Sequence, residues 1–351
     1  MTYFVTGATG FIGRFLVERL LEREGDIHVL VRESSRPKLD ALIERWGAPD
    51  RINPVVGDLE KRRLGVKKAW IDEHAGGIDH FFHLAAIYDM TADDERNRVA
   101  NVEGTRHAVE LANALRAGCL HHVSSVAAAG QYEGLFTEAM FDEGQPLDHP
   151  YHRTKFESEK IARTESEVPW RVYRPAIVVG HSQTGEMDKI DGPYYFFKTI
   201  KLSSRLPDLV PLLAPRLGDT NVVPVDFVAA ALDHIAHQPG LDGRAFHLVS
   251  PRPQRAVDVI NAFAKVAGAP RLTEALPKAA LPLALKTPGV RERVLPSLGI
   301  PAEVVDYIDF TARFDARETE AALAGTDISV PPLESYAGTL WEYWDRELAT
   351  A

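Results

Sequence analysis

The chain has 351 residues, 45% of them hydrophobic, which is enough to bury a sizeable core in two domains or in one large α/β unit. Its formal net charge of −10 argues against general nucleic-acid binding, because a phosphate backbone requires a basic surface. No apolar run approaches the roughly 18 residues of a membrane-spanning helix, so the sequence predicts none.

The amino terminus, MTYFVTGATGFIG, is typical of a strand and a turn and lacks the layout of a signal peptide. The one cysteine, Cys119, has no partner for an internal disulfide, which favours a reducing, cytoplasmic location. The 13 histidines show no metal-binding spacing, and the adjacent His121 and His122 should point to opposite faces of a strand. We therefore expect a cytoplasmic protein without a metal site.

The first predicted strand, YFVT, leads through a glycine-rich turn into an amphipathic helix. Gly7, Gly10 and Gly13 have GxxGxxG spacing, and a turn without Cβ atoms lets backbone N–H groups approach a pyrophosphate at the helix N-terminus. A plain tight turn is the other interpretation of such glycines alone. Their position between a first strand and a helix indicates a dinucleotide site.

The second predicted strand, DIHVLVRE (26–33), should end near the ribose of the adenosine. A carboxylate there typically holds the 2′-hydroxyl of NAD, whereas a 2′-phosphate requires a cation. Arg32, followed by Arg36 and Lys38, favours NADPH, with Arg32 as the first candidate contact and Arg36 as the second. Glu33 keeps NAD open, because its carboxylate could reach the ribose, and a solvated charged turn is a further interpretation.

Four more short apolar runs follow, with helical segments at 98–116 and 151–166 between them: NPVVGDLE, IDHFFHLAA, CLHHVSSVAAAG and WRVYRPAIVVG. Strands that alternate with helices predict an α/β fold with a parallel, doubly wound Rossmann sheet. Ligands of such sheets bind outside the carboxyl ends of the strands. The residues at or near those ends are Asp58, Leu84, Ala85, Ala86, Ser124, Ser125 and 174–177.

The segment LDHPYHRTKFESEKIA (147–162) puts Tyr151 and Lys155 four apart on a predicted helix, hence on one face. A phenol with a pKa of about 10 is a poor acid at neutral pH, and a nearby ammonium lowers that pKa. Ser125 could hold a carbonyl oxygen while the phenol protonates it. The pair alone could be two surface residues, but the glycine turn and the upstream serines favour catalysis.

The ordered motifs TGATGFIG (6–13), GDL (57–59), HLAA (83–86), NVEGT (101–105), SSVAAAG (124–130) and YHRTK (151–155) resemble those of the extended short-chain dehydrogenase/reductases. The resemblance covers nearly the whole chain. It implies a catalytic triad of Ser125, Tyr151 and Lys155, with Asn101 supporting a proton relay or, alternatively, capping a helix. It also implies nucleotide contacts at Gly7, Thr9, Gly10, Phe11, Ile12, Gly13, Asp58, Leu59, Leu84, Ala85, Ala86, Tyr151, Lys155, Pro175, Ile177 and Val178.

Three later segments, 173–198, 221–238 and 314–344, resemble fatty acyl-CoA reductases and the thioester-reductase domains of carboxylic acid reductases. The strongest likeness is to the amino-terminal half of two-domain bacterial fatty acyl-CoA/aldehyde reductases, whose second reductase domain we expect to be absent from a chain that ends at Ala351. This resemblance implies NADPH-dependent reduction of a fatty acyl thioester, on coenzyme A or on a carrier, or of a fatty aldehyde.

Other functions stay open. One is a reductase of a bulky hydroxy or keto compound, as in the dihydroflavonol and 3β-hydroxysteroid members of the superfamily. Another is an NADP-sensing protein without turnover. A sugar epimerase fits the positive residues after the second strand less well, and GHSQTG (180–185) lacks the final glycine of a hydrolase elbow at Thr184.

We expect residues 1–180 to form the nucleotide-binding domain, with 221–250 returning to it, and residues 181–220 and 251–351 to form a mostly helical substrate cap. The aromatic run 194–197 indicates either an acyl site or a buried helix start. Residues 275–300 could be a lid, a membrane-surface patch or a packed helix pair. Lys189, Lys198 and Lys201 are either phosphate contacts of coenzyme A or a carrier arm, or ordinary surface lysines.

Overall fold

The computed structural model describes the chain except residues 86–97, 189–191, 208–211, 253, 278–310 and 350–351. It divides into two compact units. The first comprises 1–176, 226–249 and 314–329, and the second comprises 177–225, 250–313 and 330–351. The predicted site residues Lys189 and Ala86 and most of the segment 275–300 lie outside the described residues.

The first unit contains a seven-stranded parallel sheet in the order β12-β7-β5-β4-β1-β2-β3. Its strands are β1 (Thr2–Thr6), β2 (Asp26–Val31), β3 (Ile52–Val56), β4 (His80–His83), β5 (Cys119–Val123), β7 (Trp170–Pro175) and β12 (Arg244–Leu248). Strands β2 and β3 are added on one side of β1 and the later strands on the other, so the crevice expected of a doubly wound fold lies between the ends of β1 and β4. The predicted fold class is confirmed.

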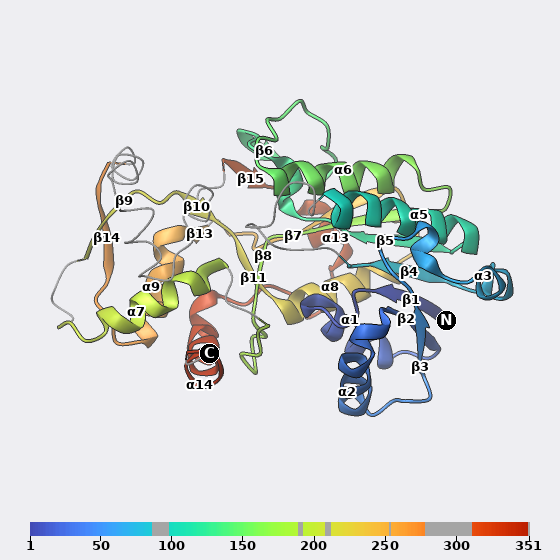
Figure 1. The fold of residues 1–351 in the computed structure, drawn as a ribbon. Coiled ribbons are helices and arrows are strands. Elements are labelled where there is room, and N and C mark those ends of the chain that lie inside the picture. Colours follow the sequence, from blue (N-terminus) through green and yellow to red (C-terminus); the bar gives the residue numbers. More distant parts are fainter. Residues whose placement is uncertain (86–97, 189–191, 208–211, 253, 278–310, 350–351) are drawn as a thin grey trace. The chain divides into compact units, whose positions relative to one another are not determined.

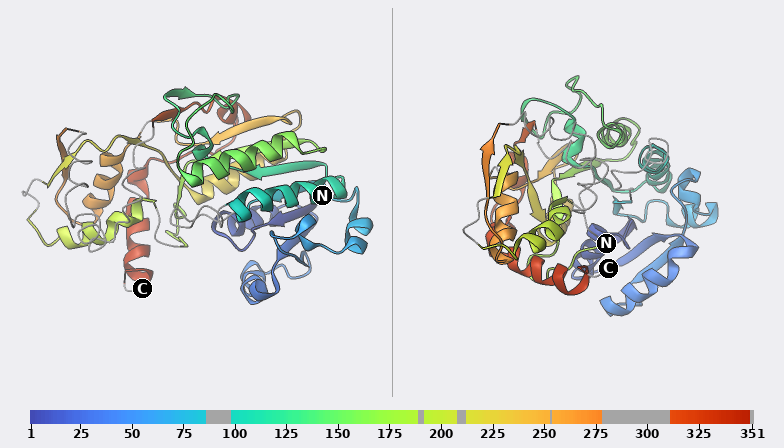
Figure 2. Two further views of the ribbon diagram at one scale, coloured as in Figure 1. Left: turned by 45° about the horizontal axis from the view of Figure 1, so that its top comes forward. Right: turned by 60° about the vertical axis from the view of Figure 1, so that its left-hand side comes forward.

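Helices cover both faces of this sheet, as Figures 1 and 2 show: α5 and α6 lie on one face, and α1 and α8 on the other. The helices that the structure describes in this unit are α1 (Phe11–Leu21), α2 (Arg36–Trp46), α3 (Lys68–His74), α5 (Gly104–Leu115), α6 (Pro150–Thr164), α8 (Val225–Ala236) and α13 (Arg317–Ala322). Shorter elements are η1 (Glu33–Ser35), η2 (Arg62–Gly65), the π-helical turn η3 (Arg98–Glu103), η4 (Val126–Ala129) and β6 (Gly134–Phe136).

Helical periodicity explains how α5 joins the core. Its buried residues recur at helical spacing, from Ala108 through Leu111 and Ala112 to Leu115, and pack with Phe4 and Phe81 of the sheet. The Phe4 and Phe81 rings stack with their centroids 4.7 Å apart. This packing fixes the start of α5 relative to the ends of β1 and β4, where the candidate site lies.

Residues 314–329, which the sequence analysis assigned to the cap, lie in the first unit. The buried carboxylate of Glu138 explains their position. It accepts hydrogen bonds from the backbone N–H groups of Glu318 and Thr319 at 2.6 and 3.1 Å, and from the Thr319 hydroxyl at 2.6 Å. The backbone N–H of His247 on β12 donates to the same carboxylate at 2.8 Å.

In its described residues, the second unit combines three two-stranded ladders with short helices. Its strands are β8 (Ile177–Val179), β9 (Leu212–Pro215), β10 (Asp219–Thr220), β11 (Val222–Pro224), β13 (Gln254–Arg255) and β14 (Leu272–Leu276), with β15 (Ala312–Phe314) at the boundary. Its helices within the described residues are η5 (Gly192–Phe196), α7 (Phe197–Ser203), α9 (Ala256–Val266), η7 (Leu333–Ser335) and α14 (Ala337–Glu347). Residues 222–224, expected to return to the main sheet, pair with β8 in this unit.

The aromatic run 194–197 contributes to the core of the second unit. Phe197 is fully buried, and its ring lies 4.6 Å from that of Phe263 and 5.0 Å from that of Trp341, centroid to centroid. The Tyr194 hydroxyl accepts a hydrogen bond from the Gly180 N–H at 2.6 Å. These contacts favour the structural interpretation of the run. Lys201 pairs with Asp345, and Lys198 is exposed.

Among helices in the described ranges, none combines the length and the hydropathy that crossing a bilayer requires.

Candidate functional site

The glycine turn between β1 and α1 forms a cradle of bare backbone. Gly7 has a φ of +75°, and a Cβ there would lie 2.7 Å from the Ala85 backbone nitrogen. A Cβ at Gly13 would lie 2.1 Å from the Gly7 carbonyl oxygen. Gly10 caps α1 without a side-chain hydrogen bond, so the first N–H groups of the helix stay available to an anion. The turn therefore fits a pyrophosphate at the helix N-terminus, and Thr9, Phe11 and Ile12 lie half-buried around it.

A buried hydrogen-bond network fixes the crevice beside this turn. The Thr6 hydroxyl lies 2.8 Å from Nδ1 of His83, and the Ala85 N–H donates to the Thr6 hydroxyl at 3.2 Å. Nε2 of His83 lies 3.2 Å from the Thr105 hydroxyl, which donates to the Asn101 carbonyl at 2.6 Å. The ends of β1 and β4 and the start of α5 are thus joined.

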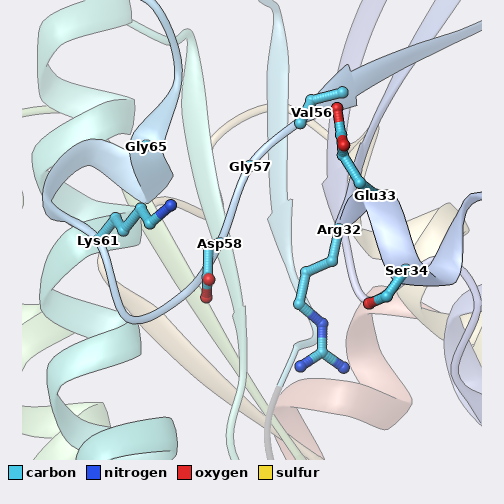
Figure 3. A pocket seen from close by; sticks show the side chains of 8 residues that line it. All are labelled: Arg32, Glu33, Ser34, Val56, Gly57, Asp58, Lys61 and Gly65. Carbon is cyan, nitrogen blue, oxygen red and sulfur yellow. The ribbon is translucent and has the colours of Figure 1, made fainter.

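A pocket of about 320 Å³ opens at the carboxyl ends of β2 and β3. It is lined by Arg32, Glu33, Ser34, Val56, Gly57, Asp58, Lys61 and Gly65, all shown in Figure 3. The Asp58 carboxylate lies between the Arg32 and Lys61 side chains, and the Ser34 hydroxyl lies beside Arg32. The position after the second and third strands is where a Rossmann fold holds the adenosine half of its cofactor.

Two cations of this pocket are unpaired. Within the described part of the chain, neither the Arg32 guanidinium nor the Lys61 ammonium has an ion-pair partner. In Figure 3 the Glu33 carboxylate turns toward Val56, away from the Arg32 guanidinium. Arg36 does not line the pocket, and its Nε lies 2.7 Å from Asp40 on the same helix. Arg36 as a cofactor contact stays a prediction.

Tyr151 and Lys155 lie on the buried face of α6, with 7% and 6% of their surface exposed. Pro150 begins the helix, and the His149 side chain caps it by accepting a hydrogen bond from the Tyr151 N–H at 3.1 Å. Helix α6 packs against η4, whose N-cap residue is Ser125. All three predicted catalytic residues therefore lie on two packed elements of one unit.

The Ser125 hydroxyl has a defined orientation. Its Oγ accepts a hydrogen bond from the Ala127 N–H at 3.1 Å, which leaves the hydroxyl proton available to another acceptor. Ser124, one position earlier, points elsewhere and donates to Glu159 at 2.7 Å. This difference supports Ser125 over Ser124 as the residue that faces a substrate.

Burial controls the charge of Lys155. Loss of hydration lowers the pKa of its ammonium to about 8, although the nearby Glu159 carboxylate opposes the decrease. Burial also lowers the pKa of His122 to about 3, and Lys155 contributes further. The pKa of His83 falls well below its usual value, first through burial and then through His122 and Lys155. Both histidines are therefore neutral at pH 7.

The remaining residues that the sequence predicts as nucleotide contacts lie on several elements of both units. Asn101 is buried in η3, and Leu84 and Ala85 follow β4. Leu59 packs against the hydrophobic core beside the pocket. Pro175 ends β7 in the first unit, whereas Ile177 and Val178 belong to β8 in the second. Contacts of these residues with a nucleotide stay predictions.

His121 and His122 lie on opposite faces of β5. His121 approaches the Tyr173 hydroxyl at 2.9 Å, whereas the His122 ring stacks on that of His83. No group of three metal-ligating side chains occurs in the described ranges. The Cys119 thiol is buried, which raises its pKa to about 12, so it is a poor nucleophile.

Several residues of this site carry no distinctive signal in the sequence. Lys61 follows the GDL motif by two positions and could have been considered with Arg32. Thr6, His83 and Thr105 lie within the quoted motifs, but only the structure shows that the His83 ring forms hydrogen bonds with both threonine hydroxyls. Glu159 lies one turn after Lys155, and nothing in the sequence indicates its partners.

Comparisons with known proteins identify the family of this chain. Residues 5–232 match the NAD-binding family described as Male sterility protein. The chain is 30% identical to the non-canonical nonribosomal peptide synthetase FrzA of Cladobotryum sp over 285 residues, 75% of this chain and 27% of that protein. It is also 30% identical to the aldehyde reductase lnbA of Aspergillus flavus over 279 residues, 73% of this chain and 27% of that protein. The matched part is thus about a quarter of either relative.

A solved structure resembles the whole chain. The terminal R domain from the myxalamid PKS-NRPS biosynthetic pathway superposes with a TM-score of 0.81 and 26% identity. The alignment covers 100% of this chain and 92% of the R domain.

Proposed function

This chain belongs to the male sterility protein family of NAD-binding domains, and we propose that it is an NADPH-dependent reductase of thioester and aldehyde carbonyls. The predicted resemblance to the extended short-chain dehydrogenase/reductases is confirmed. The match to an NAD-binding family supports a nicotinamide cofactor. The observation that carries the proposal is the burial of Tyr151 and Lys155 on one face of α6, packed beside the element that Ser125 caps.

We further propose that the substrate is an acyl group held as a thioester on coenzyme A or a carrier arm, or the aldehyde derived from it. The support is similarity to a peptide synthetase, to an aldehyde reductase and to a terminal R domain. A fatty acyl chain is the finer proposal, and it rests on the motif resemblance of 173–198 and 221–238.

Each residue of the triad has a distinct task in this proposal. A bound nicotinamide supplies the hydride that the carbonyl carbon receives. The Tyr151 hydroxyl donates its proton to the carbonyl oxygen, and the Lys155 ammonium stabilises the phenolate that remains. The Ser125 hydroxyl, with Oγ oriented by the Ala127 N–H, donates a hydrogen bond to the same oxygen as negative charge develops.

The preference for NADPH over NADH rests on the adenosine pocket. A 2′-phosphate carries the negative charge that two unpaired cations, Arg32 and Lys61, would neutralise. An unphosphorylated ribose supplies no such charge.

The proposal is tested by following NADPH oxidation at about 340 nm with three substrates: a long-chain acyl-CoA, the matching aldehyde, and a bulky ketone. We expect oxidation with the thioester, the aldehyde or both. Turnover of the ketone alone would instead support the hydroxysteroid-like function, and binding of NADPH without turnover of any carbonyl would support a sensor.

Lys61→Ala should raise the KM for NADPH by roughly 3- to 10-fold and leave the KM for NADH unchanged, because a lysine contributes a point charge to phosphate binding. Lys67→Ala is the matched control, since Lys67 is exposed in the same region but does not line the pocket. Equal effects of the two substitutions would show that Lys61 acts only through general surface charge.

A further inference from the structure

A buried carboxylate lies one helical turn beyond Lys155. Glu159 is fully buried on α6, four residues after Lys155 and therefore on the same face. Ser124 donates to its Oε2 at 2.7 Å. The guanidinium of Arg174 donates to both carboxylate oxygens, from Nε to Oε2 at 3.0 Å and from Nη2 to Oε1 at 2.6 Å.

Arg163 completes the set of partners. Its Nε donates to Oε1 of Glu159 at 2.8 Å, and its guanidinium lies over the rings of Phe141 and Trp170. Burial alone would raise the pKa of Glu159, but Arg174, Arg163 and Ser124 together hold it at about 2. Glu159 is therefore a carboxylate throughout the physiological pH range.

The surroundings of Lys155 offer little other negative charge. In the described part of the chain, Glu159 on α6, His122 on β5 and His83 on β4 interact electrostatically with it, and Tyr151 lies one turn earlier on the same helix. Both histidines are neutral, and protonating either would repel the ammonium. Glu159 thus supplies the charge that opposes the cost of burying Lys155.

We infer that Glu159 is a positioning residue for the reduction: its carboxylate keeps Lys155 in the ammonium form and, through Ser124, fixes the loop that carries Ser125. The inference rests on the proposed function, in which the Lys155 ammonium stabilises the Tyr151 phenolate. It adds a carboxylate, bound to two arginines, that acts on the triad without touching substrate.

The inference predicts opposite effects of two substitutions. For the unmodified protein, kcat should fall as the pH rises through about 8, because Lys155 then loses its proton. Glu159→Gln removes the negative charge and leaves Arg163 and Arg174 uncompensated. The basic limb of the pH profile, where kcat falls as the pH rises, should therefore move to a lower pH by about one unit or more. Arg163→Gln leaves the carboxylate less neutralised, so the limb should move up by roughly half to one pH unit.

Glu165→Gln is the matched control, because Glu165 follows α6 and pairs with Arg106 at an exposed site. It should leave the basic limb unchanged. A structural role for Glu159 would lower kcat equally at all pH values and would not displace the limb in opposite directions. Superimposable normalised profiles, or shifts of the same sign in the two variants, would overturn the inference.

A second readout does not require turnover. Competitive labelling with acetic anhydride, analysed by mass spectrometry across a pH series, reports the titration of the Lys155 amine itself. If no carbonyl substrate is reduced, the proposed function fails, while the labelling still tests the effect of Glu159 on Lys155. If Glu159→Gln does not fold, the pH profile of Arg163→Gln tests the inference alone. Arg163→Gln should fold, because the Arg163 side chain is 15% exposed and the fully buried ion pair between Arg174 and Glu159 is retained.

Discussion

Replacing Tyr151 by phenylalanine is expected to lower kcat by about 10²- to 10⁴-fold, the contribution typical of a positioned general acid. The ring and its packing on α6 are retained, and only the hydroxyl that protonates the carbonyl oxygen is lost. The dissociation constant for NADPH, measured by fluorescence titration, should change little. Both quantities are needed, because unfolding would lower kcat and also weaken NADPH binding.

Ser125→Ala tests the second hydrogen-bond donor to the carbonyl oxygen and is compared with Tyr151→Phe. It removes a hydrogen-bond donor to the same oxygen but keeps the proton donor, so its loss of kcat should be smaller. Retention of activity in Tyr151→Phe, at any level near that of the unmodified protein, would refute the assignment of Tyr151 as the acid.

Replacing Arg32 by alanine is expected to raise the KM for NADPH by about 10- to 100-fold, as for the loss of a charge-assisted hydrogen bond. The KM for NADH should stay nearly constant, because NADH has no 2′-phosphate for this guanidinium to bind. Steady-state kinetics with both cofactors measure how much more the substitution raises the KM for NADPH than the KM for NADH. An equal rise for both would mean that Arg32 serves only to shape the pocket.

Substitutions of two further arginines serve as comparisons for Arg32→Ala. Arg36→Ala measures what the second predicted cation adds, although its ion pair with Asp40 leaves less of its charge available. Arg45→Ala, on the same helix and paired at 3.5 Å with Glu18, should have no effect on either cofactor.

The sequence was sufficient to predict features that depend on neighbours along the chain. Alternation of strands and helices predicted the parallel sheet, and four-residue spacing predicted the shared face of Tyr151 and Lys155. The glycine turn was predictable because its φ value and close backbone contacts exclude side chains at Gly7 and Gly13.

Features made by distant segments were not predictable. Glu138 and Thr319 are 181 residues apart, and no periodicity in 314–329 indicates that this segment joins the first unit. The partners of Glu159 come from the residue after β5, from β7 and from its own helix, and a lone glutamate on a charged helix is normally a solvated residue. Lys61 enters the pocket only because the loop after β3 folds back.

The four hydrogen bonds at Glu138 have a consequence for any attempt to isolate the nucleotide-binding part. Three of the four donors come from Glu318 and Thr319, so a fragment that ends at residue 249 would leave the Glu138 carboxylate with only the hydrogen bond from His247. The first unit is therefore discontinuous in sequence, and the polypeptide between its pieces leaves it and re-enters it.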